Sequence, residues 1–177
     1  MEDDNWMRRA AGGDTQAFGL IVQAYQSRLV RFAARLLGDT DLAQDAAQEA
    51  FLRLWRVRKS YQPRGCLQAY LFRAVRSVCL DCARSAHSMG ALDERAEANV
   101  SDPVAVAEAQ SLADAVRLAV QSLPEAQRVV FLLSHYETLS YAEIADVLDC
   151  PLGTVASRKH QATEALRRKL FSWKDPI

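Results

Sequence analysis

Residues 139–170, LSYAEIADVLDCPLGTVASRKHQATEALRRKL, decide how the rest of the chain is interpreted. Ser140 and Glu143 have the spacing of a capping box, so we expect a short helix to begin near Tyr141. Pro151 has no backbone N–H with which to continue that helix, and a second helix is expected over about residues 153–171. This pattern is typical of a helix-turn-helix, whose second helix can enter a DNA major groove, but an ordinary helical hairpin has the same pattern.

The second helix is expected to have one apolar and one polar face. At about 100° per residue, Val155, Ala162, Leu166 and Leu170 share a side and should pack inward. The side chains that point the other way are Ala156, Ser157, His160, Gln161 and Glu164.

Composition and periodicity predict an all-α protein, and the length allows either one domain of ordinary size or two small ones. The chain has 177 residues, half of them hydrophobic, with only seven Gly and five Pro, and helical periodicity recurs along it. The formal net charge of zero argues against a general polyanion binder. The charge is uneven, however: residues 91–127 hold two basic and seven acidic residues, so basic faces can exist elsewhere.

The four cysteines, Cys66, Cys79, Cys82 and Cys150, are expected to be buried, reduced thiols. Cys79 and Cys82 form a lone C-x-x-C within a helical pattern, whereas a zinc site needs four ligands. We therefore expect no metal and no cofactor. Neither a signal peptide nor an apolar run of about 18 residues is recognisable, which favours a soluble, cytoplasmic protein.

The first half of the chain predicts three helices after a loose N-terminus at residues 1–13. A helix should begin at Asp14 and end at Gly38, because Phe18, Ile21, Tyr25, Leu29, Phe32 and Leu36 form one apolar stripe. The next, over about residues 41–58, has an alanine-rich stripe at Ala43, Ala46, Ala47 and Ala50. Its other face indicates either solvated surface or a protein-docking site, made of Asp45, Gln48, Glu49, Leu52 and Trp55.

The third helix, over about residues 67–85, follows a loop at residues 59–65. Its arginines, with nearby aromatic residues, suit single-stranded nucleic acid, because arginines bind phosphates and rings stack on exposed bases. A solvated arginine face with core aromatics is the equal alternative. The residues concerned are Lys59, Tyr61, Arg64, Tyr70, Phe72, Arg73, Arg76, Ser77 and Arg84.

A linker at residues 87–104 is expected to separate a domain at residues 14–86 from a second at residues 105–177. The linker combines Gly, Ser, Asn, Pro and acidic residues without sustained periodicity. Helices are expected after it over about residues 104–121 and 126–136.

Four segments together resemble a bacterial extracytoplasmic-function sigma factor, a small sigma factor with only regions 2 and 4. They are DTDLAQDAAQEAFLRLW (39–55), LQAYLFRAVRSVCLDCAR (67–84), LPEAQRVVFLLSHYETLSYAEIADVL (123–148) and PLGTVASR (151–158). The resemblance implies a promoter-specificity subunit that is no enzyme. Its implied partners are promoter DNA, the RNA polymerase core at the beta-prime clamp helices and beta flap, and an anti-sigma factor.

The resemblance also assigns a role to each surface. It implies that the face of residues 41–55 docks on polymerase and that residues 59–84 open and read the −10 element. It implies that the −35 element is read by Thr154, Ala156, Ser157, Arg158, His160 and Gln161.

Several positions depart from the family pattern. Ser77 stands where Asn is usual, and Ala156, Lys159 and Gln161 replace Lys, Leu and Arg, so the reading face is less basic. Lys159 is expected to lay its stem along the apolar stripe. Asp149 replaces a turn glycine, and Asp tolerates left-handed backbone.

The alternative function is a stand-alone helix-turn-helix regulator with an N-terminal sensing or dimerisation domain. An acidic docking helix followed by a basic, aromatic helix favours the sigma factor, because a sensor would not need both. An enzyme is disfavoured because no catalytic grouping or phosphate-binding loop is recognisable.

Overall fold

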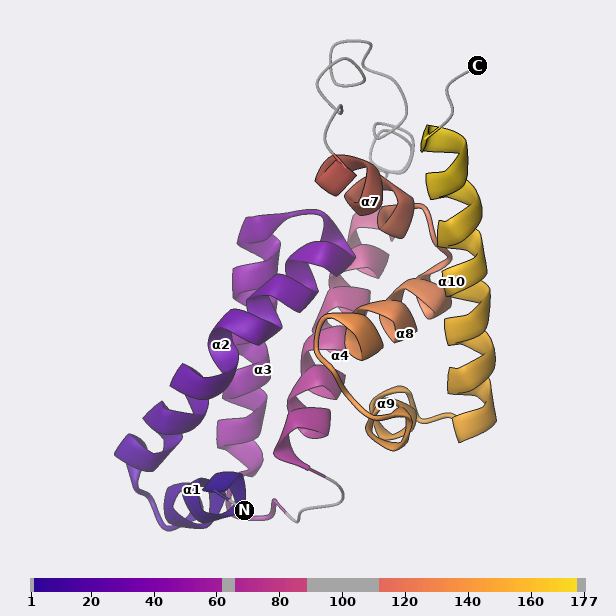
Figure 1. Ribbon diagram of the computed structural model, residues 1–177. Coiled ribbons are helices and arrows are strands. Elements are labelled where there is room, and N and C mark those ends of the chain that lie inside the picture. Colours follow the sequence, from indigo (N-terminus) through magenta and orange to yellow (C-terminus); the bar gives the residue numbers. More distant parts are fainter. Residues whose placement is uncertain (1, 62–65, 89–111, 175–177) are drawn as a thin grey trace.

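The computed structural model describes residues 2–61, 66–88 and 112–174 (Figure 1). These residues form eight helices and no strand, which confirms the all-α prediction. The helices are α1 (Glu2–Ala11), α2 (Thr15–Leu37), α3 (Thr40–Val57), α4 (Leu67–Ser88), α7 (Leu112–Gln121), α8 (Glu125–His135), α9 (Tyr141–Leu148) and α10 (Leu152–Lys174).

The expectation of a loose N-terminus was wrong, because residues 2–11 form helix α1. Acidic residues occupy its first turn, and Arg8 and Arg9 occupy its last turn. These charges interact favourably with the helix dipole and so stabilise the helix. Met7 and Ala10 are buried, and the Tyr25 hydroxyl of α2 donates a hydrogen bond to Asp3 at 2.6 Å. These contacts attach α1 to α2.

Capping residues set the ends of α2 and α3. The Asp14 side chain accepts a hydrogen bond from the Ala17 N–H at the start of α2. Gly38 ends α2 in the left-handed conformation, with φ of 76°, where a side chain would be strained. Asp39 then caps α3. The alanine stripe of α3 is fully or almost fully buried, which lets α3 lie close against α2.

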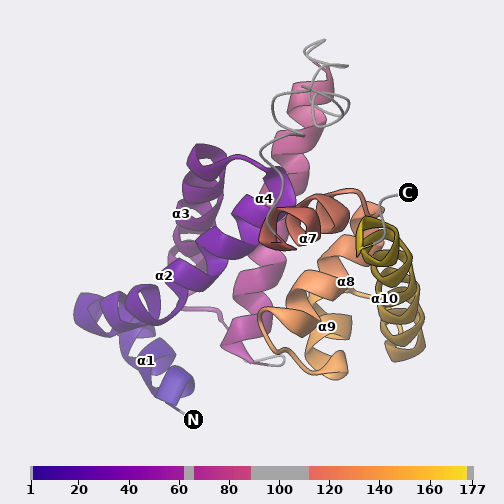
Figure 2. The same cartoon turned by 45° about the horizontal axis from the view of Figure 1, so that its top comes forward.

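Helix α4 lies between the α2–α3 pair and α9 (Figures 1 and 2). Phe72 is completely buried and packs edge-to-face on Phe32 of α2, with ring centroids 5.3 Å apart. Of the two alternatives for the aromatics of this helix, Phe72 therefore agrees with a core position and not with an exposed aromatic surface. Because α4 is covered on two sides, it buries residues on more than one side, among them Leu71, Val75 and Cys79.

The C-terminal half contains the predicted helix-turn-helix, α9 and α10. Ser140 and Glu143 form a complete capping box at the start of α9. Asp149 ends α9 in the left-handed conformation, with φ of 48°. Val155, Ala162 and Leu166 of α10 are buried as predicted, while Leu170 is partly buried.

The two halves share one buried apolar cluster instead of standing apart. Helix α9 contacts α4, and α8 contacts α2. The predicted linker at residues 87–104 lies almost entirely outside the described residues, as does the expected helical segment at residues 104–111.

Candidate polymerase- and nucleic-acid-binding surfaces

The α3 face predicted to dock on another protein is only partly open. Asp45 and Gln48 are exposed, and the Leu52 side chain is 43% exposed although it is apolar. Trp55 is half-buried: its ring meets Phe18 edge-to-face at 4.8 Å, and the Arg58 guanidinium lies 3.8 Å from the ring centroid. Trp55 therefore has a packing role within the fold.

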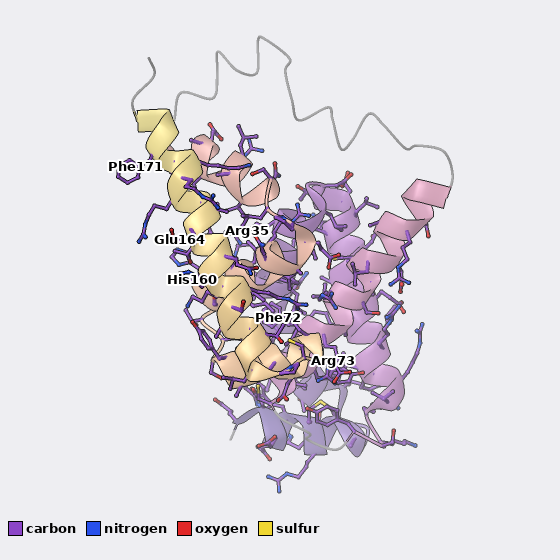
Figure 3. All side chains as sticks on the ribbon, turned by 90° about the vertical axis from the view of Figure 1, so that its right-hand side faces the viewer. Arg35, Phe72, Arg73, His160, Glu164 and Phe171 are labelled. Atoms are coloured by element: carbon purple, nitrogen blue, oxygen red, sulfur yellow. The ribbon has the colours of Figure 1, made fainter. Side chains whose placement is uncertain are left out.

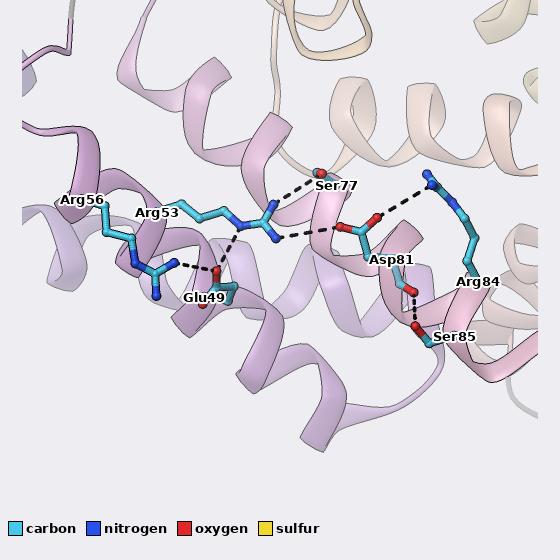
Figure 4. Close-up of polar contacts among 7 residues, drawn as sticks. All are labelled: Glu49, Arg53, Arg56, Ser77, Asp81, Arg84 and Ser85. Carbon is cyan, nitrogen blue, oxygen red and sulfur yellow. Dashed lines mark hydrogen bonds and ion pairs between the residues drawn. The ribbon is translucent and has the colours of Figure 1, made fainter. Parts of the chain in front are cut away.

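Glu49 of this face belongs to an ion-pair network that joins α3 to α4 (Figure 4). Its carboxylate accepts hydrogen bonds from Arg53 and Arg56, each at 3.1 Å, and the Arg53 bond is the main reason that its pKa is lowered. Arg53 also reaches Ser77 Oγ at 3.4 Å and Asp81 at 3.8 Å on α4. The network therefore links a predicted docking residue to a predicted DNA-binding residue.

Sequence reasoning missed Arg53 altogether. The i,i+4 spacing of Glu49 and Arg53 is readable from the sequence. The contact with Ser77 is not, because it depends on how α3 packs on α4.

The arginines of α4 divide between two directions. Arg84, which is exposed, lies 3.9 Å from Asp81 on the same helix. Arg73 and Arg76 instead reach the C-terminal half. Arg73 donates to the Asp146 carbonyl of α9, and Arg76 Nη2 lies 3.2 Å from Glu125 Oε1 of α8. The predicted arginine surface is therefore partly covered.

Two tyrosines gather at the N-terminal end of α4. Tyr61 and Tyr70 meet edge-to-face with centroids 5.5 Å apart, and both are half-buried. Burial raises both pKa values, that of Tyr61 to about 12. Lys59 is exposed nearby in sequence, and Arg64 lies outside the described residues.

The N-terminal half of helix α10 exposes uncharged polar side chains beside His160, which Figure 3 labels. Ser157, His160 and Gln161 are exposed. Gln161 accepts a hydrogen bond from Gln127 at 3.2 Å. Lys159 is partly buried, with its ammonium 5.0 Å from the centroid of the Tyr141 ring, so this cation lies against α9. The remaining predicted residues of this face are half-buried: Thr154, Ala156 and Arg158.

The order of these surfaces agrees with two family matches. Sigma-70 region 2 matches residues 21–88, and Sigma-70 region 4 matches residues 113–166. The chain belongs to the sigma-70 family, in its extracytoplasmic-function group. Below, region 2 denotes α2, α3 and α4 of this sigma factor, and region 4 denotes α7 to α10.

Curated relatives match the sigma factor over almost its whole length. It is 29% identical to the RNA polymerase sigma-H factor of Pseudomonas aeruginosa, covering 96% of this chain and 94% of the relative. It is also 29% identical to the ECF RNA polymerase sigma-E factor of Escherichia coli, covering 96% and 95%. A third relative, the ECF RNA polymerase sigma factor SigW of Bacillus subtilis, is 29% identical, and the match covers 93% of this chain and 94% of the relative.

Two solved structures share the fold. CnrH, solved with the cytosolic domain of CnrY, is 22% identical with a TM-score of 0.76, covering 97% of this chain and 99% of the other. RpoE of Bartonella quintana, solved with the anti-sigma factor NepR, is 21% identical with a TM-score of 0.69, covering 86% and 96%.

A buried ion pair joins region 2 to region 4 of this sigma factor. Arg28 Nε of α2 donates to Glu137 Oε2 at 3.0 Å, and Arg28 Nη2 donates to the Glu137 carbonyl at 3.1 Å. The Glu137 side chain is only 3% exposed. Sequence reasoning missed this pair because its members are 109 positions apart, so no local pattern connects them.

The contact between the two regions is looser near Gly38. A cleft of about 380 Å³ lies there, between the end of α2 and α7. At its wall, the Arg35 guanidinium lies 4.1 Å from the centroid of the Tyr136 ring. The hydrogen bonds and ion pairs described above instead join α2 and α4 to α8, α9 and the loop between them.

The four cysteines are free thiols with different degrees of burial. Cys79 is buried, which raises its pKa to about 12 and keeps it protonated at neutral pH. Cys66, Cys82 and Cys150 are only partly buried, so the prediction that the thiols are buried was wrong for these three. Among the described residues, no group of His, Cys, Asp and Glu is arranged to hold a metal ion. None of the described helices is long and apolar enough to span a membrane.

Proposed function

We propose that this sigma factor binds the RNA polymerase core through α3 and reads promoter DNA with α4 and α10. The observation that carries the proposal is that α3 and α4 present different chemistry on one helical unit. Asp45, Gln48 and Leu52 give α3 an acidic and amide face with one exposed leucine, whereas α4 presents arginines. We assign the α3 face, with Glu49 and Trp55, to the beta-prime clamp helices.

The α4 surface suits an opened −10 element. Arginine guanidinium groups bind phosphates through charge-assisted hydrogen bonds, and tyrosine rings stack on unpaired bases. Holding a base out of the duplex offsets the few kcal/mol that unstacking costs. We assign this role to Lys59, Tyr61, Arg64, Tyr70, Arg73, Arg76, Ser77 and Arg84.

The exposed side of α10 suits a −35 element in duplex DNA. Ser157, His160 and Gln161 carry donors and acceptors that can reach base edges in the major groove. With Thr154, Ala156 and Arg158, they form a face with few charges, so a larger share of its specificity should come from base contacts than from phosphates. Region 4 would also meet the beta flap.

The remaining assignments follow from this role. Catalysis stays with the polymerase, and the sigma factor itself is no enzyme. The cytoplasm is its compartment because the polymerase and the DNA are there. An anti-sigma factor would regulate it by covering the same faces. The domains would span residues 14–86 and 105–177, with a linker at residues 87–104.

Reconstitution tests the proposal. Purified protein is mixed with sigma-free core and a fragment of its own upstream DNA, and core binding and promoter-dependent transcripts are measured. Leu52→Arg should weaken core binding for two reasons. It removes the exposed leucine of the docking face, and it adds a positive charge to a face whose acidic residues would meet a basic partner. Leu20→Arg on α2 is the matched control, since Leu20 is 38% exposed and lies outside that face.

Failure of the unchanged protein to bind core would refute the proposed function. Equal loss of core binding in both variants would refute the assignment of the α3 face.

A further inference from the structure

Among the described residues, the hydrogen bonds and ion pairs named below between the two regions all have the same donor side. Region 2 contributes the donors, and region 4 contributes carboxylate and carbonyl acceptors. The contacts are Arg28 with Glu137, Arg73 with the Asp146 carbonyl, Arg76 with Glu125, and the Cys66 thiol with Glu143.

We propose that region 4 competes, within the same chain, with single-stranded promoter DNA for the arginines of α4. In the conformation described here, which we call closed, Arg73 and Arg76 are engaged by α9 and α8. The proposal rests on the proposed function, which assigns these two arginines to the −10 element. Promoter opening would then require region 4 to leave α4.

The chemistry of the contacts supports competition for the same donors. A glutamate carboxylate and a phosphate both present anionic oxygens to a guanidinium group. Glu125 occupies Nη2 of Arg76, whose side chain is only 27% exposed. Arg76 Nε is buried and has no hydrogen-bond partner among the described residues, so the closed contact leaves part of this guanidinium unsatisfied.

Arg28 and Glu137 place region 4 against α4 without belonging to the proposed DNA surface. Arg28 Nη1 also donates to Gln68 of α4 at 2.9 Å, so the guanidinium joins α2, α4 and the α8–α9 loop. Substituting Glu137 therefore tests closure while leaving the proposed DNA-binding residues intact.

The α3 docking face is not covered by region 4. Asp45 and Gln48 are exposed in the closed conformation, and α3 packs on α2 and α4. A closed chain can therefore present its polymerase-docking face while its −10 arginines are engaged. If only a fraction of the unchanged chains is open, a variant that is fully open should bind single strands more tightly by a factor equal to the inverse of that fraction.

The test uses the full chain and a fluorescent pool of random-sequence, single-stranded 16-mers. Glu125→Arg combined with Glu137→Gln repels Arg76 and removes the charge that holds Arg28. We expect small-angle X-ray scattering to show a larger radius of gyration and anisotropy to show on the order of tenfold tighter binding. Glu125→Arg alone, at an exposed position, should also increase the radius of gyration and tighten binding of the pool, but by less than the double variant does.

Glu164→Arg on α10 is the control, because it makes the same charge change as Glu125→Arg but away from the contact between the regions. It should leave the radius unchanged and bind the pool less tightly than the double variant does. The proposal is overturned if the double variant stays compact, or if it expands but binds no better than the control. Circular dichroism checks folding, and if the double variant unfolds, the single variant Glu125→Arg decides by the same two criteria.

A third set of variants separates this proposal from the proposed function. Arg73→Ala and Arg76→Ala are added to the opened double variant. Loss of the gained affinity supports both proposals. If the gain survives without these arginines, competition for them is overturned and their −10 assignment is wrong. Core binding by α3, which region 4 does not cover, then tests the remaining part of the proposed function independently.

Discussion

Helices α4 and α10 are both long helices assigned to promoter DNA, but they differ in what surrounds them. Helix α4 lies between the α2–α3 pair and α9, and its arginines have protein acceptors. Helix α10 packs on α7, α8 and α9 and leaves Ser157, His160 and Gln161 exposed. The strongly charged surface is thus partly covered, whereas the weakly charged surface is open. Because arginine–phosphate contacts form with any sequence, covering these arginines would limit non-specific binding by α4.

The largest expected effect separates two aromatic neighbours on α4. Phe72→Ala should lower the free energy of unfolding by about 3–5 kcal/mol, because the ring is fully buried against Phe32. Tyr70→Ala should cost clearly less, because that ring is half-buried. Urea denaturation monitored by circular dichroism measures both. Equal losses would make Tyr70 a core residue and remove it from the proposed DNA surface.

The next effect contrasts the two DNA-reading helices directly. Arg73→Ala with Arg76→Ala should lower promoter opening by about 10- to 100-fold, because two phosphate-binding groups are lost. His160→Ala with Gln161→Ala should instead change −35 sequence preference, at about 1–3 kcal/mol per lost base contact. Permanganate footprinting and competition among −35 sequences measure these results.

Core binding is the internal control for both double variants and should not change. A parallel fall in core binding on loss of the two arginines would contradict the division of region 2 into separate docking and opening faces.

The capping box of α9 gives a smaller, pH-dependent effect. Hydrogen bonding to Ser140, followed by the bond from the Cys66 thiol, lowers the pKa of Glu143 below its ordinary value of 4.5. The folded state is therefore stabilised by the carboxylate above that value, and this contribution is lost as the pH falls through the lowered pKa. Ser140→Ala should lower the free energy of unfolding by about 1 kcal/mol at pH 7 and by less at pH 3.

Denaturant unfolding at pH 7, 4.5 and 3 measures that loss. Thr163→Ala on α10 is the control, because its hydroxyl donates to the Lys159 carbonyl and to no acid. A cost for Ser140→Ala that stays constant with pH would show that the carboxylate of Glu143 contributes nothing to the cap.

The features that sequence predicted well are those decided within one helical turn. Asp14, Gly38 and Ser140 mark helix ends through side-chain caps or a positive φ, and the structure confirms all three. The inward side of α10 follows from periodicity alone. The α9–α10 turn was likewise predictable, because Asp149 and Pro151 act on their own backbone.

The features that sequence could not predict depend on packing between helices. Phe72 lies outside a single α4 stripe and is buried because α4 is covered from two directions. Helix α1 was missed because it is short and polar, with only Met7 and Ala10 buried. The Arg28–Glu137 pair requires knowing that region 4 packs on α2, which no local pattern encodes.

The smallest expected effect concerns Asp81, an acid among the arginines of α4. Its carboxylate is 3.8 Å from Arg53 and 3.9 Å from Arg84, and its side chain is 54% exposed. Asp81→Asn should raise single-strand affinity about twofold at low salt, because a charge that competes with phosphate is removed. The gain should shrink at high salt, where exposed charges are screened. Fluorescence anisotropy with the same 16-mer pool measures it.

Glu164→Gln is the matched control for Asp81→Asn, because Glu164 is a partly exposed acid, with a side chain 40% exposed, that pairs with an arginine three residues away on α10. It should change single-strand binding less, since α10 is assigned to duplex DNA. Weaker binding by Asp81→Asn would show the opposite role for this acid. Asp81 would then hold Arg53 and Arg84 in place for the strand, and the polar network between α3 and α4 would itself be part of the DNA-binding surface.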